Sequence, residues 1–237
     1  MTKVNSPLIG NHTPYGGPLV KSSKEVDKDK VINFLLEKYF EIINPNYTVI
    51  KLPPNENPKI LEKFGFSLRE TDTSLINLEK DINDLWSGIA KGTRRNIKKS
   101  EKEGVTVMVD NKGVYLDDFY NSLKSGYSDK MSIPSFEFYK TIFSVFSKNN
   151  SLSFLVALYN NKPIAFSMHL MHNKWAYAWQ LAYESEYRYL MANPLIKWEF
   201  MKMANVSGIK TYDLLGLDIP EVRSYKKKFG GDIIKLY

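Results

Sequence analysis

Three apolar segments in the second half of the chain, separated by two short turns, place the strongest constraint on the fold. The segments are LSFLVALY (152–159), PIAFSMHLM (163–171) and KWAYAWQLA (174–182). Each has the length and the content of branched and aromatic residues that are typical of a strand. The intervening NNK and HNK suit the left-handed backbone of tight hairpin turns. The pattern predicts a three-stranded antiparallel meander over residues 152–182.

Helical and strand patterns flank this meander on both sides. A strand at 105–109 and helices at 115–127 and 135–148 precede it. A helix from Asn193, the expected N-cap, with Pro194 in its first turn, a buried strand at 209–216, a helix at 220–231 and a last strand at 232–237 follow it. The order β-α-α-β-β-β-α-β-α-β predicts an α+β fold with a mixed sheet and flanking helices.

The first part of the chain has a different organisation. Amphipathic spacing predicts a helix over 27–43, followed by strands at 47–52 and 73–78 with a short helix between them. We interpret residues 1–80 as a partial N-terminal unit and residues 81–237 as the main domain. A helix from 81 is expected to break at Gly92, with Thr93 starting the next helix.

Composition favours anionic partners and excludes several kinds of site. The chain has 33 Lys and Arg against 26 Asp and Glu, a net charge of +7. It has no Cys, and its three His have no converging ligands, so we expect no metal. No apolar run approaches the roughly 20 residues of a membrane span. We therefore expect a soluble, cytoplasmic protein.

One helix concentrates positive charge. Arg94, Lys98 and Lys102 are spaced by four residues and share a face, with Arg95 beside them. Such a face either contacts nucleic-acid phosphates or is simply solvated, and the charges alone do not decide between the two.

Four segments in a fixed order resemble one family. DLWSGIAKGTRRNIKKSEKEGVTV (84–107), NPLIKWEF (193–200), YDLLG (212–216) and YKKKFGG (225–231) together look like the Fem family (FemABX-like) of peptidyltransferases, which carry two GNAT acyltransferase domains in tandem. The resemblance implies a GNAT-like fold, with residues 1–80 matching only the later part of a first GNAT-like unit. It further implies amide-bond formation on an amine of a cell-envelope (peptidoglycan) precursor, an anionic small-molecule acceptor, with aminoacyl-tRNA as donor.

The same resemblance implies the site. A Lys from the helix at 220–231, the penultimate element, enters a wedge between two diverging strands of the sheet, and Tyr225-Lys226 before Phe229-Gly230 matches this element. Lys226 would stabilise the oxyanion of acyl transfer. Asp213 is expected to orient a cation, to act as a base, or to be satisfied by backbone amides. Further substrate contacts are expected from Tyr177, which is otherwise a packing aromatic, and from Gln180, Lys130, Arg223, Tyr15 and Gly16.

Two alternatives remain open from the sequence. The junction SEYRYLMANPLIKWE (185–199) lacks the Gly-rich loop that cradles coenzyme A in ordinary GNAT enzymes. No cofactor is therefore expected, although an acyl-CoA-dependent N-acyltransferase stays possible. The second alternative is a non-catalytic relative that binds RNA or a protein partner. The oligomeric state is left open.

Overall fold

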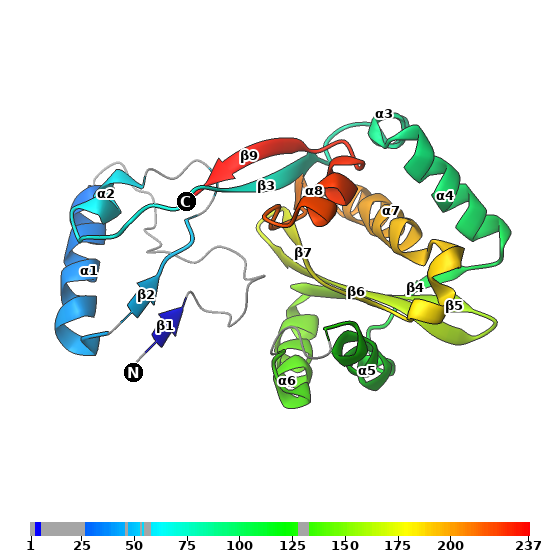
Figure 1. The fold of residues 1–237 in the computed structure, drawn as a ribbon, viewed down its shortest axis with the longest axis horizontal. Helices are drawn as coiled ribbons and strands as arrows, with labels where there is room; N and C mark the ends of the chain where they lie inside the picture. The colour runs from blue at the N-terminus through cyan, green and yellow to red at the C-terminus, as the bar shows by residue number, and fades with distance from the viewer. Residues whose placement is uncertain (1–2, 6–26, 46, 53, 55–57, 128–132) are drawn as a thin grey trace. The chain divides into compact units, whose positions relative to one another are not determined.

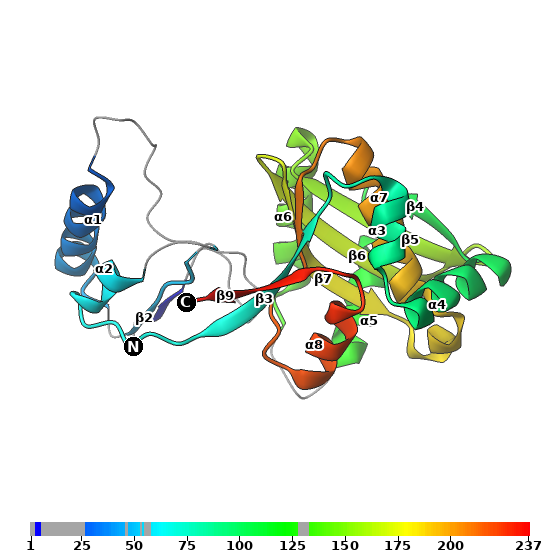
Figure 2. The same cartoon turned by 90° about the horizontal axis from the view of Figure 1, so that it is seen from above.

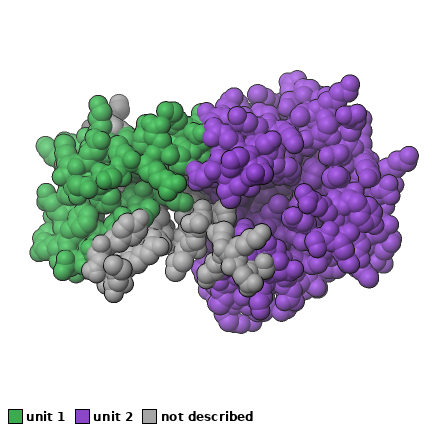
Figure 3. Space-filling view, in the orientation of Figure 1, with its two compact units in different colours: residues 1–72, 234–237 green, residues 73–233 purple. Residues whose placement is uncertain are grey.

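The computed structural model describes residues 3–5, 27–45, 47–52, 54, 58–127 and 133–237. Contacts divide the chain into two compact units, residues 1–72 with 234–237, and residues 73–233 (Figure 3). The sequence-based division into a partial GNAT-like unit at 1–80 and a main domain at 81–237 stays a prediction.

The smaller unit holds a short parallel strand pair and two helices. Strand β1 (Lys3–Asn5) pairs with β2 (Tyr47–Val49), and helices α1 (Lys28–Ile43) and α2 (Lys59–Glu62) lie beside a small core. Asp27 caps α1 by accepting from the backbone N–H groups of Asp29 and Lys30. Asn44, in the left-handed conformation, ends it. The predicted helix at 27–43 is confirmed.

The larger unit is built on a mixed sheet. The seven strands lie in the order β4-β5-β6-β7-β8-β3-β9. Their bounds are β3 (Thr71–Asn77), β4 (Thr106–Val109), β5 (Leu152–Tyr159), β6 (Lys162–His172), β7 (Trp175–Tyr183), β8 (Thr211–Asp213) and β9 (Asp232–Leu236). The helices are α3 (Ile82–Gly88), α4 (Lys91–Lys102), α5 (Leu116–Tyr127), α6 (Phe136–Phe146), α7 (Ala192–Val206) and α8 (Pro220–Lys227). The predicted element order from residue 105 onward is confirmed, as is the α+β class.

The predicted meander forms with the expected turns. Strands β5, β6 and β7 pair antiparallel in sequence. Asn160 and Asn161 have φ angles of 49° and 62°, and Asn173 and Lys174 have 45° and 66°. Two successive residues with positive φ make the tight hairpin turn whose twist matches the strands.

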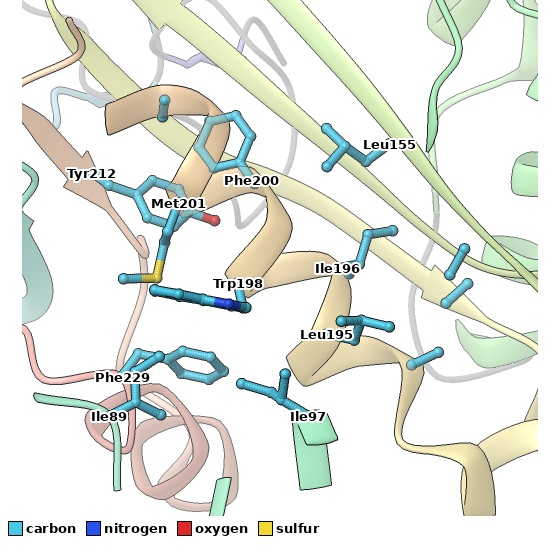
Figure 4. Close-up of a cluster of buried hydrophobic side chains, with 14 of the residues drawn as sticks. Ile89, Ile97, Leu155, Leu195, Ile196, Trp198, Phe200, Met201, Tyr212 and Phe229 are labelled. Atoms are coloured by element: carbon cyan, nitrogen blue, oxygen red, sulfur yellow. The ribbon is translucent and has the colours of Figure 1, made fainter. Parts of the chain in front are cut away.

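Helices cover both faces of this sheet. Figure 1 shows α7 on one side of β5 and β6 and α5 and α6 on the other, and Figure 2, from above, shows α3, α4 and α7 gathered over one face. On the α7 side, apolar residues of several elements form one cluster (Figure 4), including Ile89, Ile97, Leu195, Trp198, Phe200, Met201, Tyr212 and Phe229. The part of the chain that the structure describes holds no helix long and apolar enough to cross a membrane.

Two helix starts differ from the sequence prediction. The break between α3 and α4 lies at Ile89–Ala90, and Gly92 is inside α4. The residue before α4 is Ala90, so the prediction that Thr93 caps this helix is wrong. The Arg94 guanidinium satisfies the C-terminal carbonyls of α3, those of Trp86 and Ser87, so α3 ends earlier than expected.

Helix α7 also begins before its predicted cap. Met191, in the left-handed conformation, is the residue before the helix, and Asn193 lies inside the first turn. The chain enters α7 from a 3-10 helix (Ser185–Leu190), and the Met191 N–H donates to the Arg188 carbonyl. This preceding turn sets the helix start, and the polar side chain of Asn193 does not.

Candidate active site

Strands β7 and β8 pair only at one end. Trp175 pairs with Thr211, and the last pair is Tyr177 with Asp213, all in parallel register. Beyond it β7 continues to Tyr183, whereas the chain after β8 bonds to β3, because the Leu214 N–H donates to the Ser74 carbonyl. The two strands therefore diverge from Tyr177 and Asp213 onward, as the predicted wedge requires.

A β-bulge in β7 lies at this fork. Met168 of β6 pairs with Gln180, whereas His169 pairs with Ala178, which leaves Trp179 as an extra residue. The Trp179 ring lies near the ring of Tyr139 in α6, with centroids 5.8 Å apart. Bulges bend a strand and redirect its side chains, and they are frequent next to active sites. Gln180 follows the bulge, in the part of β7 that no longer pairs with β8.

Asp213 holds the turn after β8. Its side chain is fully buried, and Oδ1 accepts hydrogen bonds from the Thr73 hydroxyl and from the Leu215 N–H, the latter at 2.7 Å. Leu215 has φ +55°, a left-handed conformation that costs a non-glycine residue about 1 kcal/mol. The carboxylate thus fixes a strained turn, which agrees with the interpretation of a buried Asp satisfied in part by a backbone amide.

Lys226 reaches the same turn from α8. This helix begins with Pro220 at its first position, as predicted. The Lys226 ammonium donates to the carbonyls of Leu215, at 2.7 Å, and Gly216, at 3.0 Å. Burial lowers the pKa of Lys226 to about 8, against the opposite effect of the nearby Asp213 and Asp218. At neutral pH the group is mostly an ammonium, and two of its three donors point to backbone carbonyls.

Tyr177 completes the group at the fork. Its ring stacks with that of Trp175 at 6.2 Å between centroids. Burial, and next the charge of Asp213, raise the pKa of Tyr177 to about 12. The structure therefore brings together three predicted residues, Tyr177, Asp213 and Lys226, from three different elements.

The remaining residues predicted for the active site lie on α8 or outside the described part of the chain. The Tyr225 hydroxyl is buried without a hydrogen-bond partner among the described residues, and its ring packs edge-on against Phe229. Arg223, on the same helix, is partly buried. Tyr15, Gly16 and Lys130 lie outside the described residues.

The basic face of α4 is exposed except for Arg94, which holds the end of α3. Arg95, Lys98 and Lys102 are exposed, and Lys98 lies 6.0 Å from the centroid of the Trp86 ring. Arg94 is partly buried and donates to the carbonyls at the end of α3. The predicted contact with nucleic acid rests on the other three cations.

Sequence reasoning missed two kinds of residue. Thr73, which holds Asp213, belongs to a strand 140 residues away and carried no signal. Lys197 was visible as a lysine inside the apolar run PLIKWEF (194–200), and its side chain is only 5% exposed. It lies in the α7 core beside Tyr212.

Similar proteins were found at the level of family and fold. Residues 88–227, more than half of the chain, match the model of the acetyltransferase (GNAT) domain. No curated protein matches significantly. FemX superposes with a TM-score of 0.69 at 14% identity, covering 88% of this chain and 76% of FemX.

Two further structures have the same arrangement. The C-terminal domain assigned to a lysylphosphatidylglycerol synthetase of Agrobacterium fabrum has a TM-score of 0.66 at 14% identity, covering 89% of this chain and 73% of that one. L-PGS of Bacillus licheniformis has a TM-score of 0.63 at 10% identity, covering 88% and 74%. The predicted resemblance is confirmed for the fold, and the chain belongs to the acetyltransferase (GNAT) domain family.

Proposed function

We propose that this GNAT-family acyltransferase joins an acyl or aminoacyl group to an acceptor amine at the fork between β7 and β8. The observation that carries the proposal is Lys226, a partly buried ammonium held on two backbone carbonyls beside the buried Asp213. A positive group fixed in a water-poor site stabilises negative charge that develops in a transition state.

The reaction is a direct displacement at the acyl carbon. The acceptor nitrogen forms the new C–N bond, and the carbonyl π electrons move to oxygen, giving an oxyanion that would accept a hydrogen bond from the third N–H of Lys226. The carbonyl then re-forms and expels the donor's oxygen, or sulfur for a thioester. The attacking nitrogen loses its proton to water or a base, and the expelled oxygen or sulfur takes up a proton, so the products are an amide and a free hydroxyl or thiol.

In this mechanism Asp213 acts on Lys226. Its carboxylate fixes the turn whose carbonyls hold the ammonium, and its charge opposes the effect of burial on the pKa of Lys226. Tyr177 and Gln180 line the diverging part of β7 and would contact substrate.

Aminoacyl-tRNA is the donor that we favour. In ordinary GNAT enzymes a helix N-terminus receives the coenzyme A pyrophosphate, but here the first turn of α7 is largely buried, with Ala192 at 7% and Leu195 at 2% exposure, and Pro194 lacks an N–H. The exposed cations Arg95, Lys98 and Lys102 on α4 offer a surface for tRNA phosphates. Acyl-CoA is the alternative donor.

The acceptor that we favour is a cell-envelope precursor with a free amine. The resemblance to the Fem family supplies this class, and the net charge of +7 suits an anionic acceptor. Because aminoacyl-tRNA is made in the cytoplasm, we place the reaction there.

A transfer assay tests the proposal. The protein is incubated with total tRNA charged with labelled amino acids, or with labelled acetyl-CoA, and with amines that include sugar-nucleotide-linked peptides. Lys226→Met is expected to lower turnover about 100-fold, because one oxyanion donor is lost. Lys227→Met, an exposed neighbour on α8, is the matched control and is expected to keep wild-type turnover.

Three other outcomes of this assay would each contradict one part of the proposal. Wild-type turnover by a folded Lys226→Met variant would remove the assigned role. Transfer from acetyl-CoA alone would replace the donor. Salt-dependent tRNA binding without transfer to any acceptor would favour the non-catalytic alternative.

A further inference from the structure

A second lysine of the larger unit is buried without a carboxylate. Lys197 of α7 is 5% exposed, and none of the ion pairs among the described residues includes it. Its Nζ lies 3.5 Å from the Tyr212 hydroxyl and 5.5 Å from the ring centroids of both Tyr212 and Phe229. Burying an amine in its charged form is expensive unless a counter-charge is present, so the position of Lys197 calls for a physical reason.

Lys197 is the end of a buried polar chain. The Tyr212 hydroxyl lies 3.2 Å from His169 Nδ1, and His169 Nε2 lies 2.8 Å from the Ser167 hydroxyl. The His169 ring also stacks on Phe200 at 3.5 Å between centroids. All four members of the chain are buried, and they join α7, β8 and β6. A fully connected network of this kind fixes its members in one arrangement.

This chain ends next to the segments that hold Lys226. Tyr212 directly precedes Asp213 on β8, and Phe229 follows Lys226 by three residues. The two rings that contact Lys197 therefore belong to residues that are close in sequence to Asp213 and to Lys226. Figure 4 shows Tyr212 and Phe229 in the same cluster as the α7 residues Trp198 and Met201.

The two amines oppose each other's charge. Burial, and next the charge of Lys226, lower the pKa of Lys197 to about 7. The titratable groups that interact with Lys197 are Tyr212 on β8, Lys226 on α8 and His169 on β6. Burial and then Lys197 hold the pKa of His169 well below its ordinary value, so the imidazole is neutral.

We propose that Lys197 is a positioning residue of the site, a buried amine at Tyr212 that gives up its proton before Lys226 does. The buried positive charge is then confined to Lys226, the group that we propose binds the acyl oxygen. Acidification protonates Lys197, places a second ammonium in the core, and opposes the charge of Lys226. The inference rests on the proposed function only for the role of Lys226; the coupling itself is measurable without turnover.

Titration of individual lysines by NMR tests the coupling. In protein labelled with ¹³C-lysine, the Cε signal of Lys197 is assigned through its contacts to the rings of Tyr212 and Phe229. We expect it to titrate near neutral pH. In Lys226→Met its midpoint is expected to rise by roughly half a pH unit or more, about threefold in the dissociation constant, because a like charge has been removed.

Lys202, on the same helix with Glu199 at 2.7 Å and its side chain 40% exposed, is the internal control. Its midpoint is expected not to move. If Lys226→Met does not fold, Lys226→Gln, which keeps an N–H donor for the Leu215 carbonyl, replaces it.

A Lys197 signal that titrates at the ordinary value of a lysine, or a midpoint unchanged by either Lys226 variant, would overturn the proposal. Loss of the coupling with transfer intact would refute only this inference. Intact coupling in a chain without transfer activity would refute only the proposed function.

Discussion

Helices α4 and α8 look alike in sequence and differ in what their cations do. Both are short and rich in Lys and Arg. Arg95, Lys98 and Lys102 of α4 lie on the surface, whereas Lys226 of α8 turns inward to two backbone carbonyls. The difference lies in the neighbours, since α8 follows a strained turn held by Asp213, and α4 follows another helix. A count of positive charges therefore identifies a basic helix but not its chemistry.

The glycines of the two helices differ in the same way. Gly92, inside α4, has nothing within 4 Å of the position where a Cβ would lie. Gly230, just after α8, has φ +78°, and a Cβ there would lie 2.7 Å from the Gly88 carbonyl oxygen. The Gly230 position is thus fixed by close approach to the end of α3, and it holds α8 and Lys226 in place.

Among the substitutions that test this comparison, Gly230→Ala has the largest expected effect on stability. We expect it to lower the free energy of unfolding by about 2–4 kcal/mol, because the left-handed conformation and the backbone overlap both act against a methyl group. Urea denaturation measures the change.

Gly92→Ala is the matched control in α4, and there the same substitution is expected to raise stability by about 0.5–1 kcal/mol through helix propensity. Equal effects at the two positions would show that the packing around Gly230 is looser than the contacts indicate.

The second prediction compares two lysines that lie over aromatic rings. Lys197→Met is expected to stabilise the chain by about 2 kcal/mol at pH 7, since it removes a buried amine at the cost of one hydrogen bond. Lys98→Met on α4 removes an exposed cation 6.0 Å from the Trp86 ring and is expected to change stability by less than about 1 kcal/mol.

The shifted pKa of Lys197 determines how the effect of Lys197→Met on stability changes with pH. The pKa of Lys197 is about 7 in the folded chain against an ordinary 10.5, so between these values the unfolded chain binds a proton that the folded chain does not. Wild-type stability gains from this group as pH rises through that window. The advantage of Lys197→Met is therefore largest at pH 7 and below and shrinks toward pH 10.5. An advantage that is constant with pH would mean that Lys197 is charged in both states.

The sequence predicted what depends on local pattern. The meander turns at Asn160–Asn161 and Asn173–Lys174 were predictable because asparagine adopts positive φ at little cost, and each turn contains at least one. The break between α3 and α4 was not, since the Arg94 side chain, from the next helix, binds the last carbonyls of α3.

The candidate site also combines residues that the sequence predicted with residues that it did not. Lys226 and Asp213 were found through a resemblance in four ordered segments. Thr73 was not, because its contact with Asp213 joins residues 140 positions apart. Lys197 is recognisable in the sequence as a lysine within an apolar run. Its role could not be predicted, because it depends on Tyr212 and Phe229, which pack against it only in the folded chain.

The smallest effect concerns the surface of α4 and its proposed contact with tRNA. If Lys102 neutralises one phosphate, Lys102→Gln lowers tRNA affinity only a few-fold but reduces the slope of log affinity against log salt by about one. Lys226→Met, which removes a charge already held by two carbonyls, is expected to leave that slope nearly unchanged while abolishing most transfer. Filter binding at several salt concentrations measures both. A larger change in slope for Lys226→Met than for Lys102→Gln would reverse the comparison, because the phosphates would then lie on α8 and not on α4.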